Sequence, residues 1–112
     1  MSFRKIGVIG AGAWGTALAQ VCVRARLDTL LQAREPALVE AMRETRLNEP
    51  YLPGVTLAPQ MRFTADMADL SGCDLILAVP PAQHMRATLT RFAASHRAGV
   101  PVVLCSKGVE RG

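Results

Sequence analysis

Apolar and polar residues follow one another along the chain in blocks that predict strands alternating with helices. The first block, Lys5–Ile9, is a short apolar run that ends at a glycine, which is typical of a buried strand. Ala13–Arg24 has the length and the alanine, leucine and glutamine content of a helix. Thr29–Ala33 has the pattern of a second strand. Pro36 suits the first turn of a helix that continues over Ala37–Arg46.

The middle of the chain has a less regular pattern. Asn48–Gln60 contains three prolines and a glycine, which predicts a loop long enough to have a functional role. Met61–Thr64 follows as a short predicted strand, and we expect one or two helical turns across Ala65–Leu70.

The last part of the chain returns to the strand–helix–strand order. Asp74–Val79 is a second clear buried strand, Ala82–His96 has the pattern of an amphipathic helix, and Val100–Ser106 is the final predicted strand. Such alternation predicts one α/β domain over residues 1–112. We expect a Rossmann-like parallel sheet in the strand order 3-2-1-4-5, with right-handed crossovers and helices on both faces.

Ligands of such sheets bind beyond the carboxyl ends of the strands. Four stretches of this chain are predicted to lie there: Gly10–Gly15, Arg34–Glu35, Val79–Gln83 and Ser106–Gly108. We therefore look for function in these four places.

The glycines between the first strand and the first helix carry the strongest chemical signal. Their G-x-G-x-x-G spacing predicts dinucleotide binding when it links a strand to a helix. Gly10 would allow the tight turn, Gly12 would let the backbone approach a pyrophosphate, and Gly15 would let the helix pack closely. The phosphates would then lie at the helix N-terminus, where N–H groups and the helix dipole favour anions. A turn shaped only for packing is the alternative, which the surrounding pattern disfavours.

The end of the second predicted strand bears on the choice between NAD and NADP. The dinucleotide fingerprint expects an acidic residue about 20 positions after the glycines, where it binds the ribose 2′-hydroxyl of NAD. This chain has Arg34 followed by Glu35. The arginine favours the 2′-phosphate of NADP, whereas Glu35 would be either a ribose ligand or an exposed charge at a helix start. Both cofactors stay open.

Composition and charge exclude several classes of protein. The net charge of +4 comes from eleven arginines and two lysines. They are scattered, which favours an ordinary solvated surface over a nucleic-acid site. No segment reaches the roughly 18 apolar residues that span a membrane, and glycines interrupt the first apolar run, so we expect neither membrane insertion nor a signal peptide. Cys22, Cys73 and Cys105 lack the spacing of a metal or disulfide framework, which predicts reduced thiols, no metal and a cytoplasmic location.

Four motifs together resemble a known family. They are GAGAWGTALA, NEPYLPGV, VPPAQHMR and SKGVE, in this order. They resemble the N-terminal domain of bacterial NAD(P)-dependent glycerol-3-phosphate dehydrogenase, and the resemblance covers essentially the whole chain. It implies a cytoplasmic enzyme that interconverts dihydroxyacetone phosphate and sn-glycerol 3-phosphate, the backbone precursor of phospholipids.

The resemblance also implies roles for individual residues. Ala13 and Trp14 would line the cofactor pocket after Gly12, and Arg34 would lie by the adenosine ribose. Ala13 departs from the serine of many relatives, so it lacks the hydroxyl that would form one phosphate hydrogen bond. The alternative role for Trp14 is filling of the hydrophobic core.

Later in the chain, the resemblance assigns cofactor contacts to Pro81 and Gln83, in a Pro-x-Gln-type turn. Lys107 would contact the cofactor and the phosphorylated substrate, with an ordinary surface lysine as the alternative. His84 could donate a proton, although a capping or exposed histidine is the more common case.

The family's helical substrate-binding domain, which supplies its catalytic lysine, is absent from these residues. We therefore expect this chain to bind a nucleotide but to be inactive, or nearly so, by itself. A sheet edge and apolar surface left uncovered predict dimerisation or aggregation. The alternatives are the nucleotide-binding domain of another dehydrogenase, of hydroxyacid or ketopantoate type, and a non-enzymatic nucleotide-sensing module.

Overall fold

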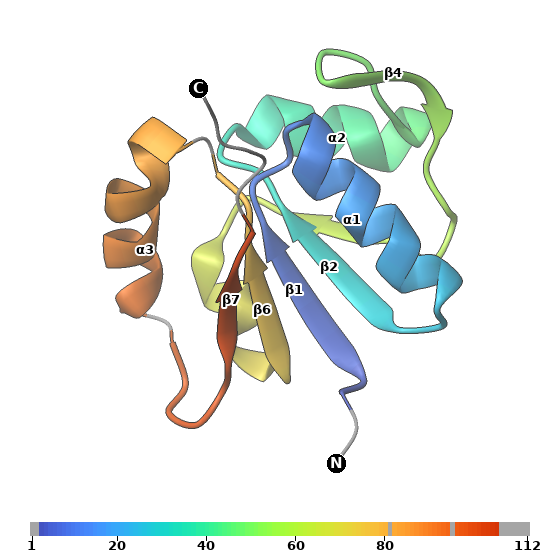
Figure 1. The fold of residues 1–112 in the computed structure, drawn as a ribbon. Helices are drawn as coiled ribbons and strands as arrows, with labels where there is room; N and C mark the ends of the chain where they lie inside the picture. The colour runs from blue at the N-terminus through green and yellow to red at the C-terminus, as the bar shows by residue number, and fades with distance from the viewer. Residues whose placement is uncertain (1–2, 81, 95, 106–112) are drawn as a thin grey trace.

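The structure, a computed structural model, describes residues 3–80, 82–94 and 96–105. Its centre is a parallel five-stranded sheet in the order β5-β2-β1-β6-β7, so that β1 is the middle strand (Figure 1). These strands are β1 (Lys5–Ile9), β2 (Asp28–Gln32), β5 (Arg62–Thr64), β6 (Leu75–Ala78) and β7 (Val102–Leu104).

The predicted parallel sheet is confirmed. All neighbouring strands of the sheet pair in parallel. Numbered along the chain within this sheet, the five strands lie in the order 3-2-1-4-5. Counted over all strands of the described chain, the order differs from the prediction. Two unexpected strands, β3 (Leu47–Asn48) and β4 (Leu52–Thr56), form a separate antiparallel pair and shift the numbers of the later strands.

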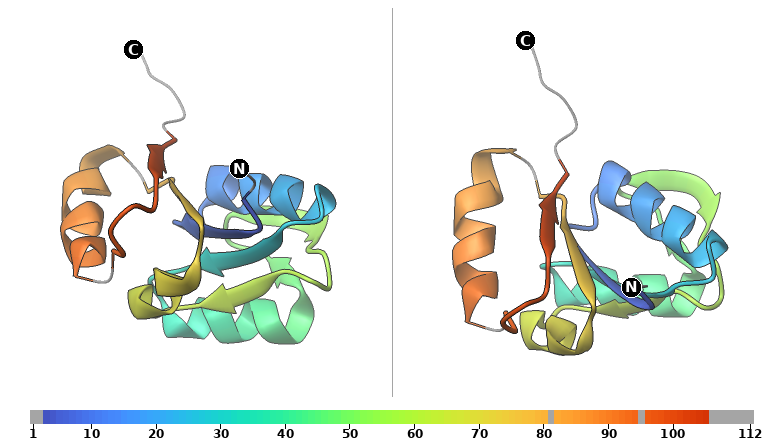
Figure 2. Two further views of the ribbon diagram at one scale, coloured as in Figure 1. Left: turned by 90° about the horizontal axis from the view of Figure 1, so that it is seen from below. Right: turned by 60° about the horizontal axis from the view of Figure 1, so that its bottom comes forward.

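Helical segments cover both faces of the sheet, as predicted. On one face, α1 (Ala13–Arg24) and α2 (Pro36–Thr45) share a core cluster with β1, β2 and β5. On the other face, the 3-10 helix η1 (Met67–Gly72) and α3 (Met85–Ala93) share a second cluster with β1, β2 and β6. Both views in Figure 2 show β6 and β7 lying between α3 and α1. Because both faces are covered, β1 is buried along almost its whole length.

The first strand and the first helix have the predicted bounds, whereas other elements differ at their ends. The second strand begins one residue earlier than predicted and ends at Gln32. Helix α2 ends at Thr45 because Arg46 adopts left-handed backbone, with φ of 59°. The strand predicted over Asp74–Val79 spans Leu75–Ala78, and the last strand is also shorter than predicted.

Two predicted helical segments are partly 3-10 helix. The turns expected from Ala65 begin at Met67 as η1, because the Asp66 carboxylate accepts a hydrogen bond from the N–H of Ala68 (2.9 Å). The long helix expected from Ala82 starts as the 3-10 helix η2 (Ala82–His84) and continues as α3, which ends at Ala93.

The prediction of a loop over Asn48–Gln60 is wrong in part. Asn48 and Leu52 pair across a tight turn, and Leu47 pairs with Thr56. The pairing has an irregular register, and Gly54 has φ of +78°. The hydrogen bonds that join the β3–β4 pair to α1, described below, link residues that are far apart in the sequence. Neither alternating hydrophobicity nor local propensity therefore signals this pair.

Candidate functional site

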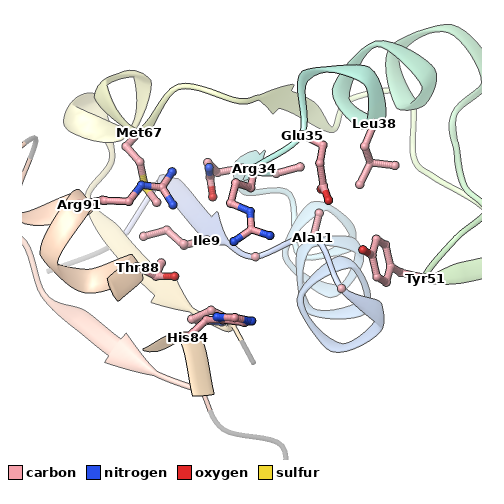
Figure 3. A pocket seen from close by; sticks show the side chains of 15 residues that line it. Ile9, Ala11, Arg34, Glu35, Leu38, Tyr51, Met67, His84, Thr88 and Arg91 are labelled. Atoms are coloured by element: carbon pink, nitrogen blue, oxygen red, sulfur yellow. The ribbon is translucent and has the colours of Figure 1, made fainter. Parts of the chain in front are cut away.

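A cavity of about 240 Å³ opens beyond the carboxyl ends of β1 and β2 (Figure 3). Ile9–Gly12 forms one part of its wall, and Gln32–Glu35 forms another. Pro80, which follows β6, completes the wall together with Thr88 and Arg91 of α3. This is the place where a parallel α/β sheet binds its ligands.

Backbone hydrogen bonds hold the strand ends around this pocket together. The N–H of Gly10 donates to the carbonyl of Gln32 (3.0 Å), and the N–H of Val79 donates to the carbonyl of Ile9 (2.8 Å). The ladder thus continues past the last residues of β1 and β6. Three of the four predicted stretches contribute described residues to the pocket wall, and Ser106–Gly108 lies outside the described residues.

The three glycines of the fingerprint have different surroundings. Gly10 has φ of +107°, and a Cβ there would lie 2.8 Å from the carbonyl oxygen of Val79. A Cβ on Gly15 would lie 1.8 Å from the carbonyl oxygen of Gly10. Gly12 lines the pocket, and its Cβ would have no atom within 4 Å. Gly10 and Gly15 are therefore required by packing, whereas packing does not explain Gly12.

The start of α1 fits the diphosphate of a dinucleotide. Gly12 is the N-cap residue, and no side chain caps the helix there. The first N–H groups of an α-helix have no partner within the helix, and together with the helix dipole they favour a bound anion. A side chain at Gly12 would project into the open space beside these groups, where the glycine leaves room for a ligand.

Arg34 and Glu35 lie where β2 ends, and both line the pocket with exposed side chains. In Figure 3, the guanidinium of Arg34 reaches into the cavity, and Glu35 lies on the side nearer Leu38. Arg34 therefore lines the pocket just after the end of β2. Its contact with a cofactor stays a prediction.

Other predicted contacts lie outside the pocket wall. Ala13, Trp14 and Gln83 are exposed and do not line the cavity. Trp14 has 42% of its surface exposed, so its alternative role as a core residue is wrong. Pro81 and Lys107 fall outside the described residues.

Several pocket residues were not singled out from the sequence as cofactor contacts. His84 is exposed at the N-cap of α3, where its side chain makes no capping bond, and it lines the pocket with Thr88 and Arg91. The spacings of four and three residues place these side chains on one helix face. Tyr51 enters from the turn between β3 and β4. The helical spacing of His84, Thr88 and Arg91 was the available signal.

Two buried amides fasten the β3–β4 segment to α1 and the glycine loop. The fully buried Asn48 donates from Nδ2 to the carbonyl of Ala11 (2.9 Å) and to Oγ1 of Thr16 (2.8 Å). Gln20 donates to the carbonyl of Thr56 (3.1 Å) and accepts from the N–H of Ala58 (3.0 Å). These bonds fix the turn that carries Tyr51.

The comparisons with known proteins agree with this geometry. The model of the NAD-dependent glycerol-3-phosphate dehydrogenase N-terminus matches residues 5–112. The chain belongs to this family. The match also removes the alternative that the chain comes from a hydroxyacid or ketopantoate dehydrogenase.

Individual relatives point the same way. The chain is 63% identical over 112 residues to glycerol-3-phosphate dehydrogenase [NAD(P)+] of Caulobacter vibrioides, covering all of this chain and 34% of that protein. It is 50% identical over 107 residues to the enzyme of the same name from Paramagnetospirillum magneticum, covering 96% of this chain and 39% of that protein. The chain thus spans a little over a third of the length of these curated relatives.

A solved structure supports the fold and the family. The crystal structure of glycerol-3-phosphate dehydrogenase from Coxiella burnetii superposes with a TM-score of 0.86 at 31% identity. The match covers 95% of this chain and 33% of the other. Within the described residues, no helix is long and apolar enough to cross a membrane.

Proposed function

We propose that this chain is the NAD(P)-binding domain of an sn-glycerol-3-phosphate dehydrogenase, which reduces dihydroxyacetone phosphate to sn-glycerol 3-phosphate for phospholipid synthesis. The observation that carries the proposal is the open space at Gly12, beside the uncapped start of α1 and within the pocket. The family match and the names of the related enzymes support the reaction.

The chain binds the dinucleotide with its diphosphate against the glycine loop and its adenosine ribose beside Arg34. When bound, NAD(P)H supplies the hydride. Ala13, Trp14, Pro81, Gln83 and Lys107 are proposed as further cofactor contacts, with Lys107 also facing the small phosphorylated substrate. Their roles rest on the family resemblance.

These residues by themselves bind the nucleotide without turning over substrate. Hydride transfer needs a substrate held against the nicotinamide with a proton source in reach. The side chains of the described pocket that could donate a proton, Glu35, Tyr51 and His84, are all exposed, so none of them is held in a closed substrate site. We place the protein in the cytoplasm, which suits its three free cysteines.

Calorimetric titration with NADPH and NADH tests the proposal, with Trp14 fluorescence as a second signal. Gly12→Val should abolish saturable binding of both nucleotides because its side chain occupies the space of the diphosphate. Gly72→Val is the matched control, because a Cβ added at Gly72 would also have no atom within 4 Å and Gly72 lies away from the pocket. Absence of binding to the unmodified chain up to millimolar nucleotide, or equal binding by Gly12→Val, would contradict the proposal.

A further inference from the structure

Arg91 contributes a second arginine to the same pocket as Arg34, from a different part of the fold. Arg34 follows β2, whereas Arg91 lies on α3, on the other side of the cavity (Figure 3). Both side chains extend into the cavity in this view. The two guanidiniums are therefore available to one ligand.

The packing of α3 fixes the direction in which Arg91 points. Its neighbour Phe92 is buried in the second core cluster, which also contains Ile9, Leu30 and Met67. Thr88, one turn earlier, is also buried and lines the pocket. With Phe92 held in the core, the helix presents Thr88 and Arg91 to the cavity.

Neither arginine is neutralised within the described part of the chain. The ion pairs there join Arg43 to Glu40 and Arg62 to Asp28. Arg34 and Arg91 make no side-chain hydrogen bond to another described residue. Glu35 is the one carboxylate among the described pocket residues, and Figure 3 places it on the far side of Arg34 from Arg91.

This distribution of charge suits a ligand with a dianionic group at the end of β2. In a dinucleotide fold that position receives the ribose 2′-hydroxyl of NAD or the 2′-phosphate of NADP. A guanidinium forms strong paired hydrogen bonds to phosphate oxygens. A hydroxyl carries no charge that could offset that of either guanidinium.

We propose that Arg91 is a specificity-determining residue for NADP, which binds the 2′-phosphate across the pocket from Arg34. The inference rests on the proposed nucleotide-binding function and decides between the two cofactors that the sequence left open. Glu35 then stays clear of the phosphate, on the side of Leu38.

Calorimetric titration of the 112-residue chain with NADPH and NADH tests this role. Arg91→Ala should weaken NADPH binding about tenfold or more, the loss expected for a charge-assisted hydrogen bond, and change NADH binding by less than about twofold. Arg86→Ala is the matched control, because Arg86 lies on the same helix but outside this pocket. The control should bind both nucleotides like the unmodified chain.

Adenosine 2′,5′-bisphosphate and AMP provide a second pair of ligands, which differ only in the 2′-phosphate. Arg91→Ala should remove most of the preference for the bisphosphate. Equal losses for NADPH and NADH, or unchanged NADPH binding, would overturn the role of Arg91 while leaving the proposed function intact. Failure of the unmodified chain to bind either dinucleotide would overturn both.

Discussion

A Cβ atom on Gly15 would lie 1.8 Å from the carbonyl oxygen of Gly10, so the first turn of α1 rests directly on the end of β1. No side chain fits between them. The contact sets the position of the helix N-terminus relative to the sheet, and with it the position of the proposed phosphate site.

Gly15→Ala should therefore destabilise the fold strongly. Relief of the clash requires α1 to move away from β1, and overpacking of this kind costs about 3 kcal/mol or more of the free energy of unfolding. Urea denaturation measures the loss. Gly12→Ala is the control and should cost about 1 kcal/mol or less, because its φ of −73° suits alanine and its Cβ has open space. Similar losses for both variants would contradict the packing argument.

Asn48→Ala should destabilise the chain by about 2 kcal/mol, since two buried hydrogen bonds to Ala11 and Thr16 are lost. Asn48→Asp should cost more, because an acceptor would replace the donor that faces the Ala11 carbonyl. Chemical denaturation of the two variants provides the comparison. An aspartate variant as stable as the alanine variant would rule out Nδ2 as the group that faces Ala11.

Replacement by glycine should have opposite effects on the free energy of unfolding at Arg26 and Arg46, two residues with left-handed backbone. Both have positive φ, 67° and 59°, and both follow a helix. Arg26→Gly should raise the free energy of unfolding by about 0.5–1 kcal/mol, since glycine adopts this backbone without a Cβ penalty and the exposed Arg26 side chain makes no hydrogen bond to a described residue.

Arg46→Gly should instead lower the stability. Its guanidinium donates to the carbonyls of Ala58 and Met61 and lies 4.9 Å from the centre of the Phe63 ring. The loss of these contacts outweighs the relief of backbone strain. Thermal unfolding of the two glycine variants gives the comparison, and an equal gain in both would show that the Arg46 contacts contribute nothing.

The free energy of unfolding should fall at low pH because the Asp74 carboxylate becomes protonated. Its carboxylate accepts hydrogen bonds from the N–H groups of Lys5 (2.9 Å) and Arg4 (3.0 Å), which hold the pKa of Asp74 below its ordinary value. A lowered pKa in the folded state contributes stability that is present above about pH 4 and is lost as the pH falls through the folded-state pKa.

Asp74→Asn provides the measurement. The difference in urea midpoint between the unmodified chain and this variant should be constant from pH 7 to about pH 5 and should shrink below about pH 4. Glu44→Gln, which alters an exposed carboxylate without a hydrogen bond to a described residue, controls for general acid effects. A difference that does not change with pH would contradict the assignment.

Self-association should occur through β7. Within the described residues it is an edge strand of the sheet, and Val103 and Leu104 are 46% and 56% exposed. An exposed apolar edge strand pairs readily with a second chain. Sedimentation velocity at increasing concentration should show oligomers that Leu104→Lys reduces. A monomer at all concentrations would refute this expectation.

Local sequence determined the parts of the fold in which neighbouring residues dictate the backbone. The bounds of β1 and α1 follow from an apolar run, a glycine turn and a helix-forming segment, and all three signals lie within 20 consecutive residues. The alternation of strands and helices likewise sufficed for the parallel sheet and its order, because right-handed crossovers leave few other arrangements.

Tertiary structure alone decided which side chains meet in the pocket. The β3–β4 pair depends on Asn48 and Gln20, whose four hydrogen bonds join residues that are 32 to 38 positions apart in the sequence. Arg91 reaches the cavity because burial of Phe92 fixes the rotation of α3. Sequence patterns record which face of an element is apolar, but the neighbour of each polar side chain depends on how the elements pack. For that reason, the sequence predicted the glycine loop and Arg34, while the opposite wall of the pocket emerged only from the packed fold.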